Sequence, residues 1–303
     1  MKFTGSDISV GSLFGFVIVL TLVEMYFSYA HDKKIYTKRD TWTNVYLMSV
    51  AVIINLIMKA ATFFLLDYCY QFRFFEISNS WIYWIVLILT QDFLYWFLHT
   101  VGHYVRFFWA MHVTHHSSEY FNLTTGFRST VFEPLYRVFF YLPLAFMGFT
   151  AIDILFAYLV TQIYGNLVHT QAVGKLHPWI EYIFVTPSHH RVHHASNVRY
   201  LDKNMGMVLI LWDRWFGTFQ EELPEDVIKY GLTTQPDDTG PVNIIFHEFV
   251  ALRRDVKKAS SFTDKLKYVF YPPGWSHDGS TKVAKVLQKE LKEKEAGNHL
   301  PIK

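Results

Sequence analysis

Long apolar stretches constrain this 303-residue chain more than any other feature of its sequence. Hydrophobic residues make up 51% of it and charged residues only 18%, and the apolar residues come in long blocks instead of short periodic runs. A helix needs about 20 mostly apolar residues to cross the hydrocarbon core of a bilayer. Residues 8–30, 45–66 and 80–98 meet that requirement. The sequence therefore predicts an all-α integral membrane protein.

A fourth apolar segment, residues 132–168, is too long for one crossing and carries Gly148 near its middle. It predicts a hairpin of two short spans, 132–149 and 150–168, which brings the expected total to four or five transmembrane helices. Residues 206–217 are also apolar but too short to cross, so we expect them in the membrane interface.

The expected organisation has three regions. N-terminal transmembrane helices occupy residues 1–98, a histidine-box catalytic region with the membrane hairpin occupies 99–220, and a polar, cytoplasmic C-terminal tail occupies 221–303. Apolar residues near the end of the tail recur with helical spacing among lysines, which is typical of a solvated surface helix or of a helix on a membrane surface. They are Val283, Val286, Leu287 and Leu291.

Basic residues predict the orientation of the spans, because short loops rich in lysine and arginine stay in the cytoplasm. The loop after the first span contains Lys33, Lys34, Lys38 and Arg39. The next loop offers only Arg73, and the tip of the hairpin offers no basic residue. Counting spans forward from a cytoplasmic first loop places His99 and His169 on the cytoplasmic side. The expected location is multi-pass, in a bacterial inner membrane or the endoplasmic reticulum.

An alternative is that residues 1–30 form a signal peptide cleaved after Ala30, which would place the histidines outside. The polar start of the chain has one lysine and Asp7 instead of a basic region, which favours a retained span. A net charge of only +2 argues against nucleic-acid binding as the function. The single cysteine, Cys69, excludes an intramolecular disulfide and a cysteine-based metal site, so any metal must be held by nitrogen or oxygen.

Three histidine boxes carry the chemistry of the sequence. Residues three and four apart share one face of a helix, so each box can direct two or three imidazoles at one point. The boxes are HTVGH (His99, His103), HVTHH (His112, His115, His116) and HRVHH (His190, His193, His194). His169 and His189 lie where they could join, whereas His177 has no partner at a suitable spacing. So many imidazoles exceed the need of one four-coordinate zinc and match two metal ions; imidazole alone suits zinc, copper, iron or nickel.

Asp92 lies two helical turns before His99, inside an apolar span where an acid is costly and usually functional. It is a candidate catalytic-site residue that accepts a hydrogen bond from a ligand imidazole and fixes its tautomer. The alternative is that Asp92 pairs with a nearby cation such as Lys59.

The order of the three boxes, at the cytoplasmic ends of membrane helices, resembles the fatty acid hydroxylase and sterol desaturase superfamily of non-haem diiron enzymes. The segments THHSSEYFNLTTGFR, TPSHHRVHHASN and DKNMGMVLILWDRWFGTFQEE look most like its alkylglycerol monooxygenase branch. The resemblance implies a cytoplasmic diiron cap, dioxygen, and hydroxylation of a C–H bond on a lipid, with an ether lipid as one candidate. The histidines named above, His177 excepted, would then hold two iron ions.

Two positions depart from that pattern. Tyr104 stands where the branch has a glutamate linked to pterin dependence, so tetrahydrobiopterin and a redox protein both stay open as the electron donor. Val173 stands where some members have a further histidine, and His189 is the candidate to replace it. The same site could instead desaturate or hydroxylate a sterol, carotenoid or fatty acyl chain. A metal transporter or sensor is a different alternative, but a transporter would place its ligands near the bilayer midplane.

Overall fold

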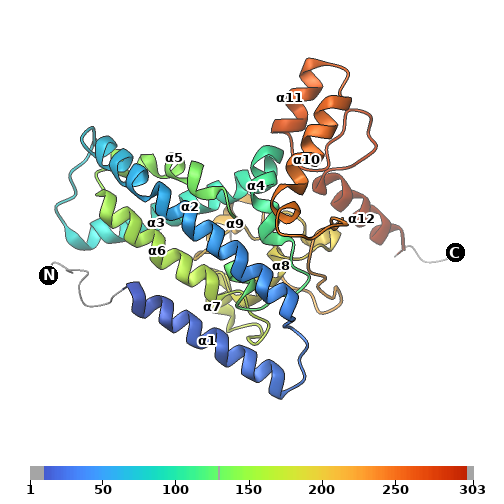
Figure 1. Cartoon of the computed structure of the whole chain (residues 1–303), viewed down its shortest axis with the longest axis horizontal. Coiled ribbons are helices and arrows are strands. Elements are labelled where there is room, and N and C mark those ends of the chain that lie inside the picture. The colour runs from blue at the N-terminus through green and yellow to red at the C-terminus, as the bar shows by residue number, and fades with distance from the viewer. Residues whose placement is uncertain (1–9, 129, 299–303) are drawn as a thin grey trace.

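The computed structural model describes residues 10–128 and 130–298, where the chain forms helices joined by loops, with two isolated β-bridges. Long helices form a bundle, and shorter helices gather at one end of it as a cap (Figure 1). The bundle consists of α1 (Val10–Ala30), α2 (Lys38–Tyr70), α3 (Ser80–Tyr104), α5 (Glu133–Phe146) and α6 (Ala151–Leu167). The remaining helices are α4 (Arg106–His116), η1 (Thr125–Phe127), α7 (Pro178–Ile183), α8 (Pro187–His193), η2 (Val198–Tyr200), α9 (Leu211–Phe216), α10 (Asn243–Lys258), α11 (Phe262–Phe270) and α12 (Ala284–Asn298).

The second predicted span is longer than its apolar block. Helix α2 begins after Thr37, whose side chain accepts a hydrogen bond from Asp40 N, and it runs for 33 residues. At 1.5 Å per residue that length is about 50 Å, which exceeds a hydrocarbon core of about 30 Å. The polar first turns of α2 therefore extend beyond the lipid into the cap.

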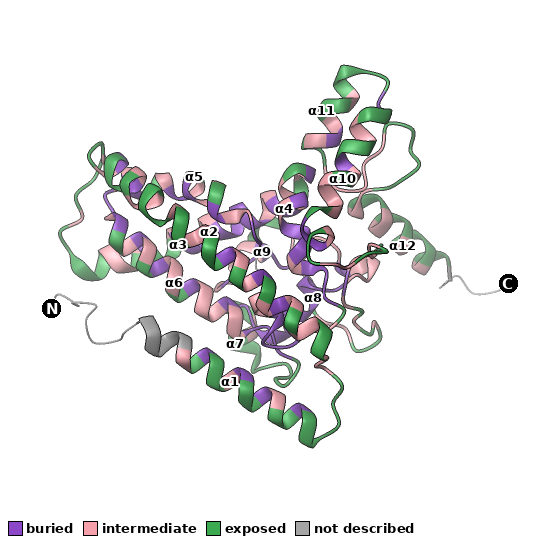
Figure 2. Cartoon of the chain, in the orientation of Figure 1, coloured by how far each residue is buried: buried purple, intermediate pink, exposed green. Residues whose placement is uncertain are grey.

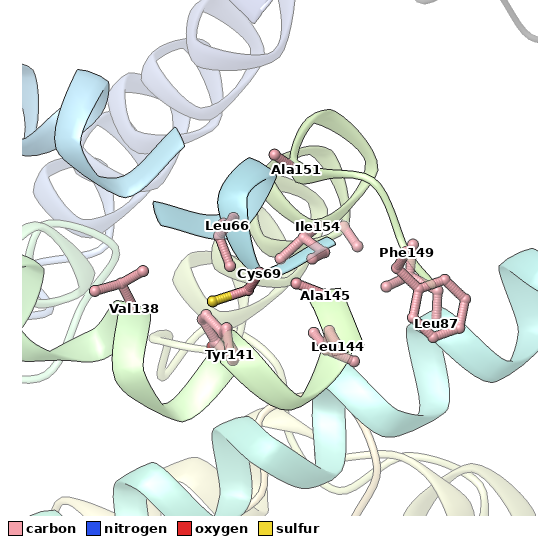
Figure 3. Packing of buried hydrophobic residues seen from close by; sticks show 11 residues of the cluster. Leu66, Cys69, Leu87, Val138, Tyr141, Leu144, Ala145, Phe149, Ala151 and Ile154 are labelled. Carbon is pink, nitrogen blue, oxygen red and sulfur yellow. The ribbon is translucent and has the colours of Figure 1, made fainter. Parts of the chain in front are cut away.

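Packing inside the bundle holds α2, α3, α5 and α6 together. Leu66 and Cys69 of α2, Leu87 of α3, Leu144 of α5 and Ile154 of α6 are all buried in one cluster (Figure 3). Small residues in the cluster allow α5 and α6 to approach closely at the hairpin. Gly148, at φ +97°, makes the turn between them, in a backbone conformation that favours glycine.

The outer faces of the bundle are apolar and exposed (Figure 2). Of the 33 residues of α2 only Asn44, Leu47, Ala51, Leu66 and Cys69 are buried, whereas residues such as Ile53, Leu56, Ile57 and Phe64 face outward. So large an apolar surface is unfavourable in water and matches the interior of a bilayer. The prediction of an all-helical membrane protein is confirmed at this level.

The helices of the bundle differ in length, and not all of them are long enough to cross a bilayer. Among the described residues, α2 and α3 are both long and apolar enough to cross a membrane, and the apolar parts of α1 and α6 are shorter. Helix α5 has 14 residues, about 21 Å, which is shorter than a full crossing. The total of four or five spans stays a prediction.

The C-terminal tail contacts the rest of the molecule. Ile244 and Ile245 of α10 pack against Leu47 of α2 and Val131. Arg106, at the start of α4, donates hydrogen bonds of 2.8 Å to both Glu248 and Asp255 of α10. The predicted helix near residue 287 is α12, which contacts η2. The division into three regions stays a prediction.

Candidate metal centre

The fold brings nine of the predicted histidines into two adjacent groups. Within each group the candidate donor atoms all lie within 4.8 Å of one another. The five-histidine group contains His99, His103, His112, His116 and His193. The four-histidine group contains His115, His169, His190 and His194.

Local helix geometry explains how each box contributes. His99 and His103 lie one turn apart near the end of α3, and the three histidines of the second box lie in the last turns of α4. The third box lies on α8, which begins with Pro187 after Thr186 and ends at His193. His169 follows the end of α6. Four separate segments therefore meet at one end of the bundle.

The Nε2 atoms inside each group are spaced as ligands around one cation. In the four-histidine group, His169 Nε2 lies 2.9 Å from His190 Nε2 and 3.1 Å from His194 Nε2. In the five-histidine group, His112 Nε2 lies 3.0 Å from His99 Nε2 and 3.2 Å from His116 Nε2. Two nitrogens that each lie about 2.1 Å from a metal are about 3.0–3.4 Å apart at octahedral to tetrahedral angles. The spacing therefore fits metal coordination.

The opposite ring nitrogens are held by other groups. Nδ1 of His99, His115, His169 and His193 lies 2.7–2.9 Å from the backbone carbonyl oxygens of Met205, Arg128, Gly165 and Lys203 respectively. A carbonyl accepts a hydrogen bond, so each Nδ1 must carry the proton. That tautomer leaves the Nε2 lone pair directed into the group, which is the form that a metal requires.

Burial maintains the neutral form of these imidazoles. Burial, together with neighbouring histidines, lowers the pKa of His112, His116, His190, His193 and His194 well below the ordinary value. The pKa of His115 falls to about 4, mainly because the ring is buried. The buried Nε2 atoms of His103 and His193 have no hydrogen-bond partner among the described residues. Buried nitrogens that face one another without hydrogen-bond partners fit a metal ion.

Two further polar contacts to the metal groups have no sequence signal. His103 Nδ1 lies 3.2 Å from Asp202 Oδ1, and His112 Nδ1 lies 3.2 Å from Thr130 Oγ1. Asp202 adopts φ +53°, in a loop 99 residues away from His103. No periodicity or motif links such distant residues, so sequence reasoning missed them.

His189, which we expected among the ligands, lies outside both groups. Its Nε2 is 3.0 Å from Glu181 Oε2, and its Nδ1 accepts a hydrogen bond from Thr186 N. It therefore fastens α8 to α7 and points away from its neighbour His190. His177, which we set aside, is exposed and caps α7.

Asp92 contacts neither a ligand imidazole nor Lys59 in the described structure. Its carboxylate accepts hydrogen bonds of 2.9–3.0 Å from Val208 N, Leu209 N and Trp212 Nε1. These bonds fix the loop that begins at Met205, whose carbonyl holds His99. Asp92 thus holds the loop next to the site, and the contact to His99 that we expected from Asp92 is made by the carbonyl of Met205.

A cavity of about 520 Å³ leads from the bundle to both groups. Its walls come from α2, α5 and α6, with half-buried apolar residues such as Met48, Leu155 and Leu159. At its inner end it reaches His99 and His112 of one group and His115, His169 and His190 of the other. An apolar cavity inside a membrane bundle admits a hydrocarbon chain.

Polar residues interrupt the apolar wall of the cavity. Arg137 donates hydrogen bonds to Glu133 Oε1 at 3.3 Å and to Asn55 Oδ1 at 3.0 Å, and it also contacts the hydroxyl of Tyr158. All four line the cavity, as do Gln162 and Asn166, which each carry a buried polar atom without a partner among the described residues. The arrangement can bind a ligand that has both an apolar chain and a polar group.

Comparison with known proteins agrees with this arrangement. A family model described as fatty acid hydroxylase matches residues 84–218, which include both metal groups. Alkylglycerol monooxygenase of Caenorhabditis elegans is 36% identical over 201 residues, covering 63% of this chain and 39% of that protein. The Homo sapiens alkylglycerol monooxygenase is 36% identical over 210 residues, covering 68% and 45%. Ornithine lipid hydroxylase OlsE of Rhizobium tropici is 27% identical over 148 residues, covering 48% and 44%.

The chain spans less than half the length of each of these curated relatives. No solved structure matches it.

Proposed function

We propose that this protein, whose residues 84–218 belong to the fatty acid hydroxylase family, is a membrane-bound monooxygenase that hydroxylates a C–H bond of a lipid. The observation that carries the proposal is the apolar cavity whose inner end reaches histidines of both metal groups. A lipid chain that enters from the bilayer would meet the metal centre without passing through water. The names of the relatives support an ether lipid of the alkylglycerol type as the first substrate to test.

Two iron ions are the proposed cofactor. His99, His103, His112, His116 and His193 would hold one, and His115, His169, His190 and His194 the other. When bound, the irons would activate dioxygen for attack on an unactivated C–H bond. Imidazole is a suitable ligand for iron, and nine neutral imidazoles leave the full positive charge of the metals uncompensated, which favours a strongly electrophilic centre.

The residues of the chain would supply positioning and a dry environment. The carbonyls of Met205, Arg128, Gly165 and Lys203 keep four imidazoles in the ligand tautomer. The apolar wall of the cavity would hold the chain and exclude water, and the polar group around Arg137 would hold the hydroxyl or ether oxygens of the substrate. Because Glu133 neutralises Arg137, this polar group favours an uncharged headgroup over a phosphate.

For an ether lipid the overall reaction balances as follows. One atom of dioxygen enters the carbon next to the ether oxygen, and the other leaves as water, with two electrons and two protons from an external donor. The resulting hemiacetal breaks into an aldehyde and an alcohol. Tyr104 is partly exposed at the end of α3, and both tetrahydrobiopterin and a redox protein remain candidate donors.

The test uses the full chain, purified in lipid nanodiscs after expression with sufficient iron. Elemental analysis is expected to find about two irons per chain. The enzyme is supplied with a 1-O-alkylglycerol, ¹⁸O₂ and either electron donor. Mass spectrometry is expected to detect a fatty aldehyde that carries ¹⁸O, after rapid reduction to the alcohol so that the oxygen does not exchange with water. One tightly bound zinc with no iron and no oxygen consumption would contradict the proposal. Metal flux in sealed vesicles without lipid oxidation would instead favour a transporter.

A further inference from the structure

Helices α10 and α11 form a hairpin that projects to one side of the bundle at its cap end (Figure 1). Their inward faces pack against each other through Leu252, Ala259 and Tyr268. Helix α10 is also fixed to α4 by the bonds from Arg106 to Glu248 and Asp255. The hairpin is therefore a firmly attached part of the cap.

The outward face of α10 is an apolar and basic stripe. Val242, Phe246 and Val250 recur every four residues, and Arg253 and Lys257 continue the same face of the helix. All five are exposed, Val250 by 62%. This face lies opposite Glu248 and Asp255, which bind Arg106, so the stripe points away from α4.

Helix α11 repeats the arrangement. Phe262, Leu266 and Phe270 recur every four residues and are 75%, 42% and 59% exposed. Tyr268, on the opposite side of the helix, is buried against α10. The exposed phenylalanines of two neighbouring helices form an apolar patch instead of single surface residues. Such a patch indicates a surface that binds a membrane or another molecule.

The charges of the hairpin are unbalanced on its outer side. Its acidic residues Glu248 and Asp255 are bound by Arg106, and the Asp264 carboxylate accepts a hydrogen bond of 2.6 Å from Ser261 Oγ at the start of α11. The exposed cations have no comparable partners within the described part of the chain; they include Arg253, Lys257, Lys258 and Lys265. A face that combines phenylalanine with unpaired lysine and arginine is complementary to an anionic lipid surface.

The lipid-facing surface of the bundle continues to this hairpin. Exposed Phe97 of α3 contacts Phe140 of α5 with tilted rings, and Phe140 contacts Phe108 of α4. Arg106 N, beside the exposed Phe107, donates a hydrogen bond of 3.1 Å to Tyr271 O, directly after α11. On α10, Phe246 contacts Phe132 at the start of α5. The hairpin thus begins where the apolar belt of the bundle ends.

We propose that the α10–α11 hairpin binds the surface of the surrounding bilayer, with its phenylalanines in the interface and its basic residues on anionic headgroups. This surface would fix the depth and tilt of the cap relative to the lipid. It is independent of the reaction proposed above, since it requires only that the bundle lies in a membrane.

The test places single cysteines in a Cys69→Ala background and labels them with a nitroxide. Leu266→Cys and Val250→Cys report on the hairpin, and Lys294→Cys, exposed on α12, is the matched control. In phosphatidylcholine nanodiscs with phosphatidylglycerol, the first two labels should collide with oxygen more, and with a water-soluble nickel complex less, than the label at 294. Equal access of the nickel complex at all three positions would overturn the proposal.

A charge-reversed chain tests the basic residues separately. The double variant Lys257→Glu with Lys265→Glu should weaken binding of the hairpin to anionic nanodiscs. The ratio of lipid-bound to free hairpin, read from the label at 266, should fall about fivefold for each lysine that is lost. Neutral nanodiscs should show little change, and unchanged iron content and melting temperature would confirm an intact fold. The labels could instead become shielded from the nickel complex only as the protein concentration rises in detergent, and stay accessible in nanodiscs that hold one copy. That result would overturn the proposal and show that the hairpin binds a second copy of the chain.

Discussion

His193 and His194 are adjacent in the chain, but their rings cross at 87° and belong to different histidine groups. His193 ends helix α8 and faces His99, with ring centroids 4.5 Å apart, whereas His194 faces His115 at the same separation. One turn of a short helix therefore supplies ligands to both metal positions. The spacing of the third box requires such a division, because neighbours on a helix point about 100° apart.

Replacing either histidine with alanine is expected to abolish lipid oxidation while leaving a folded membrane protein. Each change removes one imidazole from a different group, so each should lower the iron content by up to one ion per chain. His177→Ala, at an exposed position, is the control and should keep activity within a few-fold. Elemental analysis and turnover measurements decide the matter. An active His193→Ala chain beside an inactive His177→Ala chain would make the ligand assignment wrong.

His189→Ala is expected to retain both irons. The ring bonds to Glu181 and Thr186 instead of facing a metal group. Its loss leaves the buried Thr186 N without its acceptor, whereas Glu181 keeps the hydrogen bonds from Leu176 N, Thr186 and Ser188. The expected cost is about 1–3 kcal/mol of unfolding free energy, seen as a lower melting temperature. Iron content measured on the folded fraction is the decisive readout, and loss of one iron with an unchanged melting temperature would assign His189 to the metal centre.

Asp202→Ala is expected to weaken iron binding by about 10–100-fold, because an outer carboxylate orients its imidazole and raises its basicity. The change leaves His103 in place but removes the acceptor of its Nδ1 proton. Competition with a chelator measures the affinity. Asp237→Ala, at an exposed position, is the control, and equal chelator resistance in both variants would contradict the role of Asp202.

Asp92→Asn is expected to reduce stability more than metal affinity. An amide can replace only one of the two carboxylate oxygens that bind Val208 N, Leu209 N and Trp212, so at least one buried donor loses its partner at a cost of about 1–3 kcal/mol. The melting temperature should fall, while turnover per bound iron stays near the original value. Asp67→Asn, exposed on α2, is the control. Loss of turnover without loss of stability would instead support a direct catalytic role.

The orientation of the chain is open to cysteine labelling from outside intact cells. Tyr200 of η2, which follows the third histidine box, is fully buried and unsuitable as a reporter. Lys34→Cys and Asp237→Cys, both exposed, should be protected from an impermeant reagent if the cap faces the cytoplasm. Glu76→Cys, in the loop at the other end of the bundle, should react. The reverse pattern would place the histidine boxes outside.

The amino-acid sequence by itself determined the local features of this protein. Apolar blocks predicted helices within a few residues of α3 and α6, because hydrophobic length and turn-forming glycine act over short distances. The spacing of His112, His115 and His116 predicted a chelating helix face for the same reason. The choice of two metals followed from the number of imidazoles.

Only the tertiary structure decided which histidine belongs to which group and what holds each ring. His169 and His189 had equal standing in the sequence, but the packing of α6 and α8 brings one into the four-histidine group and turns the other toward Glu181. The acceptors for His99 and His103 are the carbonyl of Met205 and the carboxylate of Asp202, about a hundred residues away. Such contacts depend on how distant segments pack, and every residue has a backbone carbonyl, so no local pattern of residue types identifies the one that a distant ring will meet.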